Sequence, residues 1–139
     1  MPDDKVAFEL VSPEKLLVSQ PVDMVVVPGS EGDFGVLPGH APLISTVRPG
    51  VIEIYEGNSV RQRIFVAGGF AEVTAERCTV LAEQAMPVAD IDPSRVEQQL
   101  RDARDDASGA KSQSERENAE RRASVAAAKL EAVKRGAVH

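Results

Sequence analysis

The sequence predicts a β-rich N-terminal domain, a sandwich or a barrel, followed by an antiparallel hairpin of two helices. Three observations support this division. Fifteen of the 19 valines lie before residue 91, and so do eight of the ten glycines and eight of the nine prolines. Short β-branched runs separated by Gly and Pro turns are typical of all-β sandwiches and barrels. After residue 91 the chain carries ten of its 18 alanines, with apolar residues at helical spacing.

Residues 6–82 are expected to form short strands joined by tight turns. Apolar and polar residues alternate in several of these runs, as they do in half-buried strands. Gly68 and Gly69 are expected to separate two strands, because glycine weakens a strand interior. The single cysteine, Cys78, is expected to be a buried thiol. The expected strands cover 6–10, 16–19, 23–27, 43–48, 51–55, 59–67, 70–74 and 78–82.

Two helices are expected after the β domain. Asp92 is a natural N-cap for the first helix, and Gly109 marks its end. Ser112 or Ser114 can cap the second helix, since each has a glutamate three residues later, and Gly136 is expected to end it. The apolar stripes comprise Val96, Leu100, Ala103 and Ala107 in the first helix, and Ala119, Ala123, Ala126, Ala127, Leu130 and Val133 in the second.

The change in composition also predicts the domain boundaries. We expect a β-sandwich domain over 1–86, a linker over 87–92 and a helical hairpin over 93–139. Apolar residues make up 42% of the chain but aromatic residues only 4%, so the core must be built from Val, Ile and Leu. The short link between the helices predicts an antiparallel pair.

The charge of the protein excludes several classes of partner. The net charge of −6 argues against a nucleic-acid-binding protein, whose binding face is basic. No cluster of cysteines or histidines predicts a metal site. No run of about 18 apolar residues and no signal peptide is visible, which predicts a soluble protein of a reducing compartment that reaches a membrane only through a partner.

The connection over 27–43 is the most shaped part of the sequence, with four glycines and three prolines. It is not a phosphate-binding loop, because no Gly-Lys-Ser/Thr follows and acidic residues lie beside it. Its tip carries Glu31, Asp33 and Phe34, an aromatic side chain next to carboxylates. Two interpretations are open: a tight sheet connection with solvated acids, or a docking tip for another protein.

No residue pattern predicts an enzyme. His40 could act as a general base oriented by Asp33, but the sequence offers no nucleophile and no paired carboxylates to act with it. A structural or interface histidine is therefore the favoured interpretation.

Four segments resemble a known family. Residues 29–35 read Gly-Ser-Glu-Gly-Asp-Phe-Gly, residues 38–43 read Pro-Gly-His-Ala-Pro-Leu, and residues 48–50 read Arg-Pro-Gly. Residues 67–73 read Ala-Gly-Gly-Phe-Ala-Glu-Val. These segments resemble the signatures of the epsilon subunit of bacterial F-type ATP synthases, and the resemblance extends over nearly the whole sequence.

The resemblance implies a ten-stranded β-sandwich, a two-helix hairpin and a non-catalytic subunit of the rotary central stalk. In that family the sandwich contacts the gamma subunit and the ring of membrane c subunits. The resemblance places Glu31, Asp33 and Phe34 at the c ring and His40 at gamma. It also implies a peripheral location at the cytoplasmic face of the bacterial inner membrane, with ion-driven rotation coupled to ATP synthesis.

The helical hairpin carries two further expectations. Some members of the family bind ATP through a motif that Asp92 and Arg95 match, although Val96 stands where the motif has a small residue. No cofactor is expected, and weak ATP binding is the alternative. The second helix is basic over 116–135, with six basic and three acidic residues. The resemblance implies the alpha/beta catalytic subunits as partners and supplies an acidic loop on the beta subunits. The basic helix would contact that loop and restrain ATP hydrolysis through Arg116, Arg121, Arg122 and Lys129, with Lys134 and Arg135 nearby.

Two rival functions follow from the same sequence. One is a free-standing nucleotide sensor that uses Asp92 and Arg95, and the other is a β-sandwich adaptor with a helical tail. The epsilon-subunit interpretation predicts binding to gamma, whereas the sensor interpretation predicts a nucleotide-dependent monomer.

Overall fold

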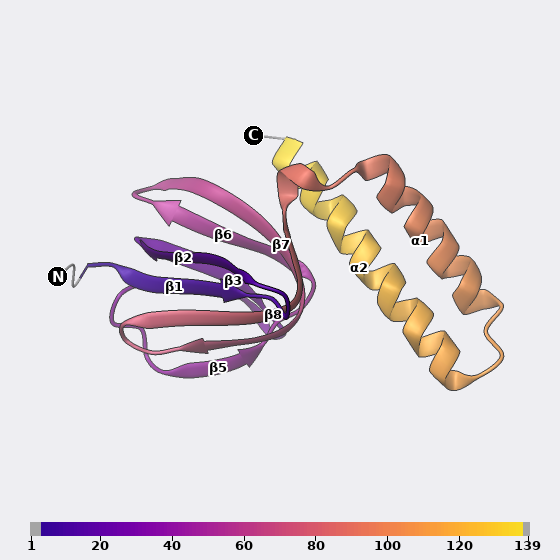
Figure 1. Cartoon of the computed structure of the whole chain (residues 1–139), viewed down its shortest axis with the longest axis horizontal. Helices are drawn as coiled ribbons and strands as arrows, with labels where there is room; N and C mark the ends of the chain where they lie inside the picture. The colour runs from indigo at the N-terminus through magenta and orange to yellow at the C-terminus, as the bar shows by residue number, and fades with distance from the viewer. Residues whose placement is uncertain (1–3, 138–139) are drawn as a thin grey trace. The chain divides into compact units, whose positions relative to one another are not determined.

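The computed structural model describes residues 4–137, which form strands, one short 3-10 turn and two helices (Figure 1). The chain divides into two compact units between Pro87 and Val88. The domains predicted from the sequence were 1–86 and 93–139, with a linker over 87–92. The elements are β1 (Val6–Val11), β2 (Leu16–Val22), β3 (Met24–Gly29), β4 (Gly32–Val36), β5 (Leu43–Thr46), β6 (Gly50–Glu56), β7 (Ser59–Val73), β8 (Arg77–Pro87), η1 (Val88–Asp90), α1 (Pro93–Ser108) and α2 (Gln113–Ala137).

The strands form a two-layered sandwich because β7 and β8 each belong to both layers. The first half of β7 pairs with β6, and its second half pairs with β5. Strand β8 pairs with β7 along its length, and its first half also runs parallel to β1. One layer thus holds β4, β3, β6, the first half of β7 and the second half of β8. The other holds β2, β1, the first half of β8, the second half of β7 and β5.

The sandwich and the helix pair are confirmed, but the strand count is corrected from ten to eight among the described residues. Gly68 and Gly69 do not end a strand. Their φ angles of 73° and 103° let the backbone pass from one layer to the other while the pairing with β8 keeps its register. If the halves of β7 and β8 are counted separately, five segments lie in each layer. Figure 1 shows both strands curving strongly.

Residues 32–36 are a second correction, since we expected them within a loop and they form β4. This strand pairs with β3 through a tight hairpin. Its sequence is rich in glycine and shows no β-branched run, which is why local propensity missed it. Backbone pairing with β3 and the burial of Val36 stabilise it instead.

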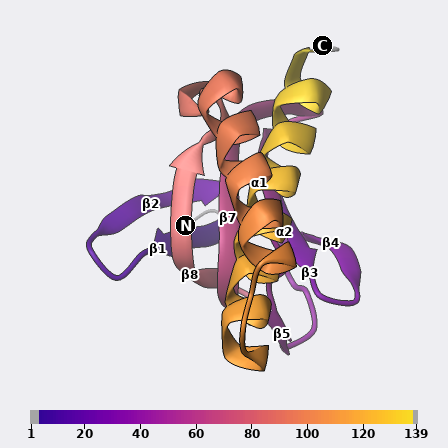
Figure 2. The same cartoon turned by 90° about the vertical axis from the view of Figure 1, so that its right-hand side faces the viewer.

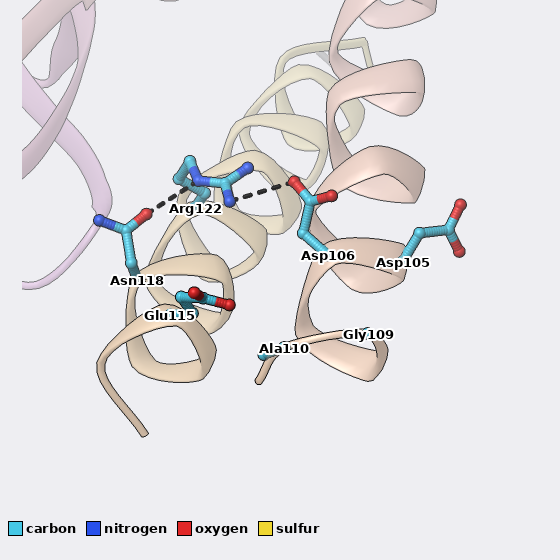
Figure 3. A pocket seen from close by; sticks show the side chains of 7 residues that line it. All are labelled: Asp105, Asp106, Gly109, Ala110, Glu115, Asn118 and Arg122. Carbon is cyan, nitrogen blue, oxygen red and sulfur yellow. Dashed lines mark hydrogen bonds and ion pairs between the residues drawn. The ribbon is translucent and has the colours of Figure 1, made fainter. Parts of the chain in front are cut away.

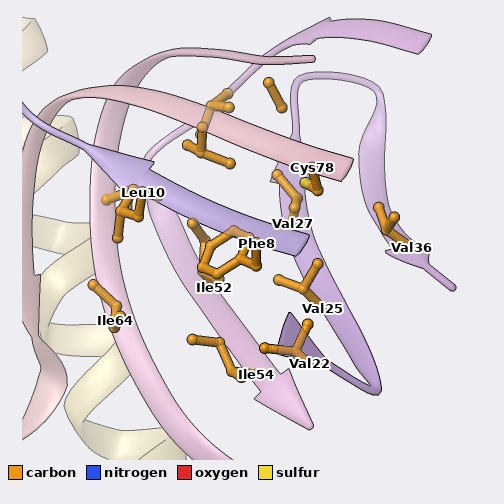
Figure 4. Packing of buried hydrophobic residues seen from close by; sticks show 14 of the residues in the cluster. Phe8, Leu10, Val22, Val25, Val27, Val36, Ile52, Ile54, Ile64 and Cys78 are labelled. Atoms are coloured by element: carbon orange, nitrogen blue, oxygen red, sulfur yellow. The ribbon is translucent and has the colours of Figure 1, made fainter. Parts of the chain in front are cut away.

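The core between the two layers is aliphatic, as the composition predicted. Its buried cluster combines inward residues of β1, β2, β3, β4, β6, β7 and β8, including Phe8 on β1 (Figure 4). Each fully buried Val, Leu or Ile side chain contributes about 1.5–3 kcal/mol. Cys78 lies in this core, fully buried as expected, and burial raises its pKa to about 12. The thiol is therefore protonated at neutral pH.

The helical unit is an antiparallel hairpin, and Figures 1 and 2 both show α1 and α2 side by side. The Asp92 carboxylate accepts hydrogen bonds from the backbone N–H of Ser94 (3.1 Å) and Arg95 (3.5 Å), which confirms it as the N-cap. Of the two serines that could cap α2, Ser112 does so, because its Oγ accepts from the N–H of Glu115 at 3.1 Å.

The helices meet along the stripes that the sequence predicted, except at one residue, and α2 ends later than predicted. Val96, Ala103, Ala119 and Ala126 are buried, but Ala127 is exposed. Helix α2 also continues through position 136 to Ala137, the last described residue. Glycine costs only about 1 kcal/mol in a helix, so position 136 does not by itself end α2.

Candidate docking surfaces

The tip of the β3–β4 hairpin is a two-residue turn formed by Ser30 and Glu31. Gly29 pairs with Gly32 across it, and Gly32 has a φ of 132°, where glycine carries no steric cost. Glu31 is exposed and forms no hydrogen bond or ion pair among residues 4–137. The hairpin thus presents one unpaired carboxylate at its tip.

Asp33 differs from Glu31, because its carboxylate is already engaged. The Arg48 Nη2 atom donates to Asp33 Oδ1 at 2.5 Å, and Arg48 Nη1 donates to the Gly29 carbonyl at 2.6 Å. Both charged side chains remain about half exposed. One arginine therefore bridges both strands of the hairpin.

Phe34 lies behind the tip rather than on it. Its ring is half buried, packs against the core, and covers Gly29 so closely that a Cβ at Gly29 would lie 2.9 Å from the ring atom Cε1. Of the three residues predicted to form the tip surface, Glu31 and Asp33 are exposed, whereas Phe34 supports the hairpin from inside.

His40 closes a turn next to β5. Its N–H donates to the Leu37 carbonyl at 3.1 Å, and the Gly39 N–H donates to the Ala75 carbonyl at 2.8 Å, which ties this turn to the β7–β8 turn. The half-buried imidazole places Nδ1 at 2.7 Å from the Ala41 carbonyl. No hydrogen bond joins His40 to Asp33 within the described residues, and Asp33 is held by Arg48 instead.

The layer that contains β5 has an exposed apolar outer face, which the sequence reasoning missed. Phe70 pairs with Leu81, and their neighbours Ala71 and Val80 point into the core, so these two side chains point outward. Phe70 is 47% exposed, Leu81 41% and the nearby Ile44 on β5 72%. We call Ile44, Phe70 and Leu81 the outer apolar face. Strand alternation in 70–73 and 78–82 was the signal that could have identified it.

Asp92 and Arg95, the predicted nucleotide-binding pair, lie at the start of α1. The Asp92 carboxylate caps the helix, Arg95 is exposed, and Val96 is buried between the helices. The match of Asp92 to the motif therefore has a local structural reason. ATP binding stays a prediction.

The four predicted basic contacts on α2 differ in their surroundings. Arg116 and Arg121 are exposed and form no ion pair among the described residues. Arg122 donates to Asp106 Oδ2 at 3.2 Å and to Asn118 Oδ1 at 3.0 Å (Figure 3). Lys129 is half buried, and this burial lowers its pKa. Arg116 and Arg121 are therefore the residues best placed to meet an acidic partner.

A hollow of about 390 Å³ lies at the turn of the hairpin, at the end of α1 opposite to Asp92 (Figure 3). Its carboxylates outnumber its one cation, Arg122, which is already paired. A phosphate group would be repelled there. The lining residues are Asp105, Asp106, Gly109, Ala110, Glu115, Asn118 and Arg122.

Residues 4–137 hold neither a metal-binding cluster nor a membrane-spanning helix. No group of three or more His, Cys, Asp or Glu side chains is arranged to hold a metal ion. No helix in the described range is long and apolar enough to cross a membrane.

The described residues thus form a β-sandwich with an acidic hairpin tip and an exposed apolar face, followed by a two-helix hairpin. Residues 5–88 match the family model of the beta-sandwich domain of the ATP synthase Delta/Epsilon chain. Residues 92–139 match that of the C-terminal domain of the ATP synthase epsilon chain. The protein belongs to the family of ATP synthase epsilon chains, which are non-catalytic stalk subunits of that complex.

Individual relatives agree with this assignment. The sequence is 58% identical over 135 residues to the ATP synthase epsilon chain of Rhodospirillum centenum, covering 94% of this protein and 92% of the relative. It is 56% identical over 127 residues to that of Rhodospirillum rubrum, covering 91% and 95%. In fold it resembles a subunit in the structure of the Euglena gracilis mitochondrial ATP synthase OSCP/F1/c-ring, with a TM-score of 0.79, 24% identity, and coverage of 98% and 82%.

Proposed function

We propose that this subunit couples rotation to ATP synthesis by joining the gamma subunit to the c ring. It would act at the cytoplasmic face of the bacterial inner membrane, held there through the complex. The observation that carries this proposal is that the sandwich has two different exposed surfaces, an apolar one and an acidic one.

The outer apolar face is the proposed gamma contact, and His40, in the turn that precedes β5, would belong to the same contact. Exposed apolar groups rimmed by polar residues mark protein interfaces, because leaving them in water forgoes about 25 cal/mol per Å². Glu72 lies among them, paired in register with Ile44, so the face combines apolar area with a charge that can set orientation.

The tip of the β3–β4 hairpin is the proposed contact with the polar loops of the c ring. Glu31 and Asp33 are both exposed there, Glu31 unpaired among residues 4–137 and Asp33 paired with Arg48. Acidic groups at an interface rim determine register and encounter rate more than affinity. Phe34 would act by supporting the tip, since its ring packs inward.

Replacing Phe70 and Leu81 together by Glu tests the gamma contact. The change puts two charges on the outer apolar face, so the full-length protein should no longer co-purify with gamma. Arg61→Glu, on the first half of β7, is the control and should bind normally. Normal gamma binding by the double variant would contradict the proposal.

The helical hairpin is the proposed restraint on ATP hydrolysis. Its exposed cations Arg116 and Arg121 would meet an acidic loop of the beta catalytic subunits, while Arg122 is held by Asp106 within the hairpin. Salt weakens the electrostatic attraction at such an exposed contact, with a screening length of about 8 Å at physiological ionic strength.

Deletion of residues 110–139 in the assembled complex should raise ATP hydrolysis while synthesis continues. Reversing Arg116 and Arg121 to Glu should reproduce part of the rise at low salt and less of it at moderate salt. Arg122→Glu is a matched comparison and should have a smaller effect. Unchanged hydrolysis after the deletion would show that the hairpin is not a restraint.

A further inference from the structure

The tip of the β3–β4 hairpin is fastened to the segment 46–48, which follows β5. The Ser30 N–H donates to the Thr46 carbonyl at 2.9 Å, and Thr46 Oγ1 donates to Ser30 Oγ at 2.7 Å. The Arg48 N–H donates to the Pro28 carbonyl at 2.9 Å. These bonds join two hairpin residues to a segment more than 15 positions away, so they depend on the folded sandwich.

Within the described residues, the Arg48 side chain is the only group of this segment that hydrogen-bonds to both strands of the hairpin. Its guanidinium bonds the Gly29 carbonyl on β3 and the Asp33 carboxylate on β4. Such a planar fork suits two acceptors at once, and bonds to a charged group are stronger than neutral ones. Among the strands of residues 4–137, β4 otherwise pairs only with β3.

This arrangement gives the two acidic residues different roles. Asp33 is neutralised within the sandwich by Arg48, whereas Glu31 has no partner in residues 4–137. The one free negative charge at the tip is therefore on Glu31. A docking loop that is held in one conformation before binding loses less conformational entropy when it binds.

We propose that Arg48 is a positioning residue: its bonds to Gly29 and Asp33 hold the tip so that Glu31 is the carboxylate presented to a polar or basic partner loop. Asp33 acts through Arg48 rather than by touching the partner. This inference rests on the proposed role of the tip in docking.

Hydrogen exchange in the isolated full-length protein tests the positioning. Arg48→Gln and Asp33→Asn should each speed amide exchange at positions 30–33 by about three- to tenfold, because each removes a charge-assisted bond. The double variant should exchange no faster than the faster single variant, and Arg48→Lys should lie between Arg48→Gln and the parent. The pair Arg61–Glu56, at 3.4 Å and more exposed, is the control, and Arg61→Gln should leave the tip unchanged. Unchanged tip exchange in Arg48→Gln would overturn the proposal.

Proton pumping per ATP hydrolysed, measured in the assembled complex, tests which carboxylate meets the partner. Arg48→Gln and Asp33→Asn should lower this ratio equally and without additivity, while Glu31→Gln should lower it further when combined with either. A loss in Asp33→Asn without one in Arg48→Gln would assign the contact to Asp33 and overturn the inference. If tip exchange responds as expected but no tip variant changes the ratio, the docking function is wrong while the positioning by Arg48 stands.

Discussion

The single side chain of Asp23 joins the ends of several strands of the sandwich. Its carboxylate accepts hydrogen bonds from Lys5 Nζ and from the Gly57 N–H, which ties the residue before β1, the β2–β3 connection and the β6–β7 turn together. The hydrogen bond from Lys5, followed by that from Gly57, lowers the pKa of Asp23. The same bond raises the pKa of Lys5.

Asp23→Asn should therefore remove a pH-dependent part of the stability. A lowered folded pKa means that the contribution of Asp23 is present above its ordinary value of 3.8 and is lost as pH falls through the folded pKa. The melting temperature of the variant should be lower than that of the parent at about pH 6, and the two should converge below pH 3.8. Thermal unfolding across this range measures the effect, with Glu14→Gln as a control that shifts little. A gap that stays constant with pH would contradict the assignment.

Gly69 is the residue that lets β7 change layers. Its φ is 103°, and a Cβ there would lie 1.9 Å from the Leu81 carbonyl oxygen. Gly57 also has a positive φ, 63°, but no atom lies within 4 Å of its Cβ position. An alanine at position 57 would therefore introduce backbone strain alone, whereas an alanine at position 69 would add a steric clash to that strain.

We expect Gly57→Ala to destabilise the sandwich by about 1 kcal/mol, the cost of a left-handed conformation. Gly69→Ala should lower the free energy of unfolding by the same strain cost plus more than about 2 kcal/mol, because the added Cβ clashes with backbone atoms that cannot rotate away. Urea unfolding of the full-length protein compares them. Equal losses would show that the layer crossing tolerates a side chain.

Among the elements, α1 and α2 pack against each other with little buried apolar area. The buried residues of this hairpin are mostly alanines, such as Ala103 at 1% and Ala119 at 0% exposure. Small residues let the helices approach closely but bury little apolar area. A larger side chain in this seam should therefore separate the helices.

Ala103→Leu should destabilise the hairpin by about 1–3 kcal/mol through overpacking. Ala127→Leu, on the exposed surface of α2, should change stability by less than about 0.5 kcal/mol. Hydrogen exchange in the full-length protein should show loss of protection in α1 and α2 for Ala103→Leu, with the sandwich amides unchanged. Equal protection in both variants would mean that the seam is not closely packed.

For the whole molecule, the two units differ in how much core each possesses. Every member of the described buried cluster of the sandwich lies within 6–82, and the cluster includes residues from both layers. The helical unit contributes none of them. The sandwich therefore has its own source of stability.

A truncated protein that ends after Asp90 should fold alone and unfold cooperatively. This end point keeps all of β8, whose last residue, Pro87, pairs with Ile64. Circular dichroism should show a β-type spectrum, and heating should give a single transition. A spectrum without β structure would mean that the sandwich needs the helices.

Local patterns were enough to predict the fold class. The valine-rich segment, the helix stripes, the Asp92 cap and the buried Cys78 each depend on spacing or residue type within a few positions, and the structure has all four. The same patterns missed β4 and wrongly divided β7. Both errors arise where backbone pairing with a neighbouring strand outweighs local propensity.

The two-part organisation, a β-sandwich with an aliphatic core and an amphipathic helix pair, could be predicted from the sequence, because the period of burial depends on residues close together in the chain. Which charged side chains are paired could be found only from the folded structure. Asp33 and Arg48 are 15 positions apart, and Asp106 and Arg122 are 16 apart. Their pairing depends on strand register and helix packing, which bring distant positions within hydrogen-bonding distance and thereby leave Glu31 as the unpaired carboxylate of the tip among residues 4–137.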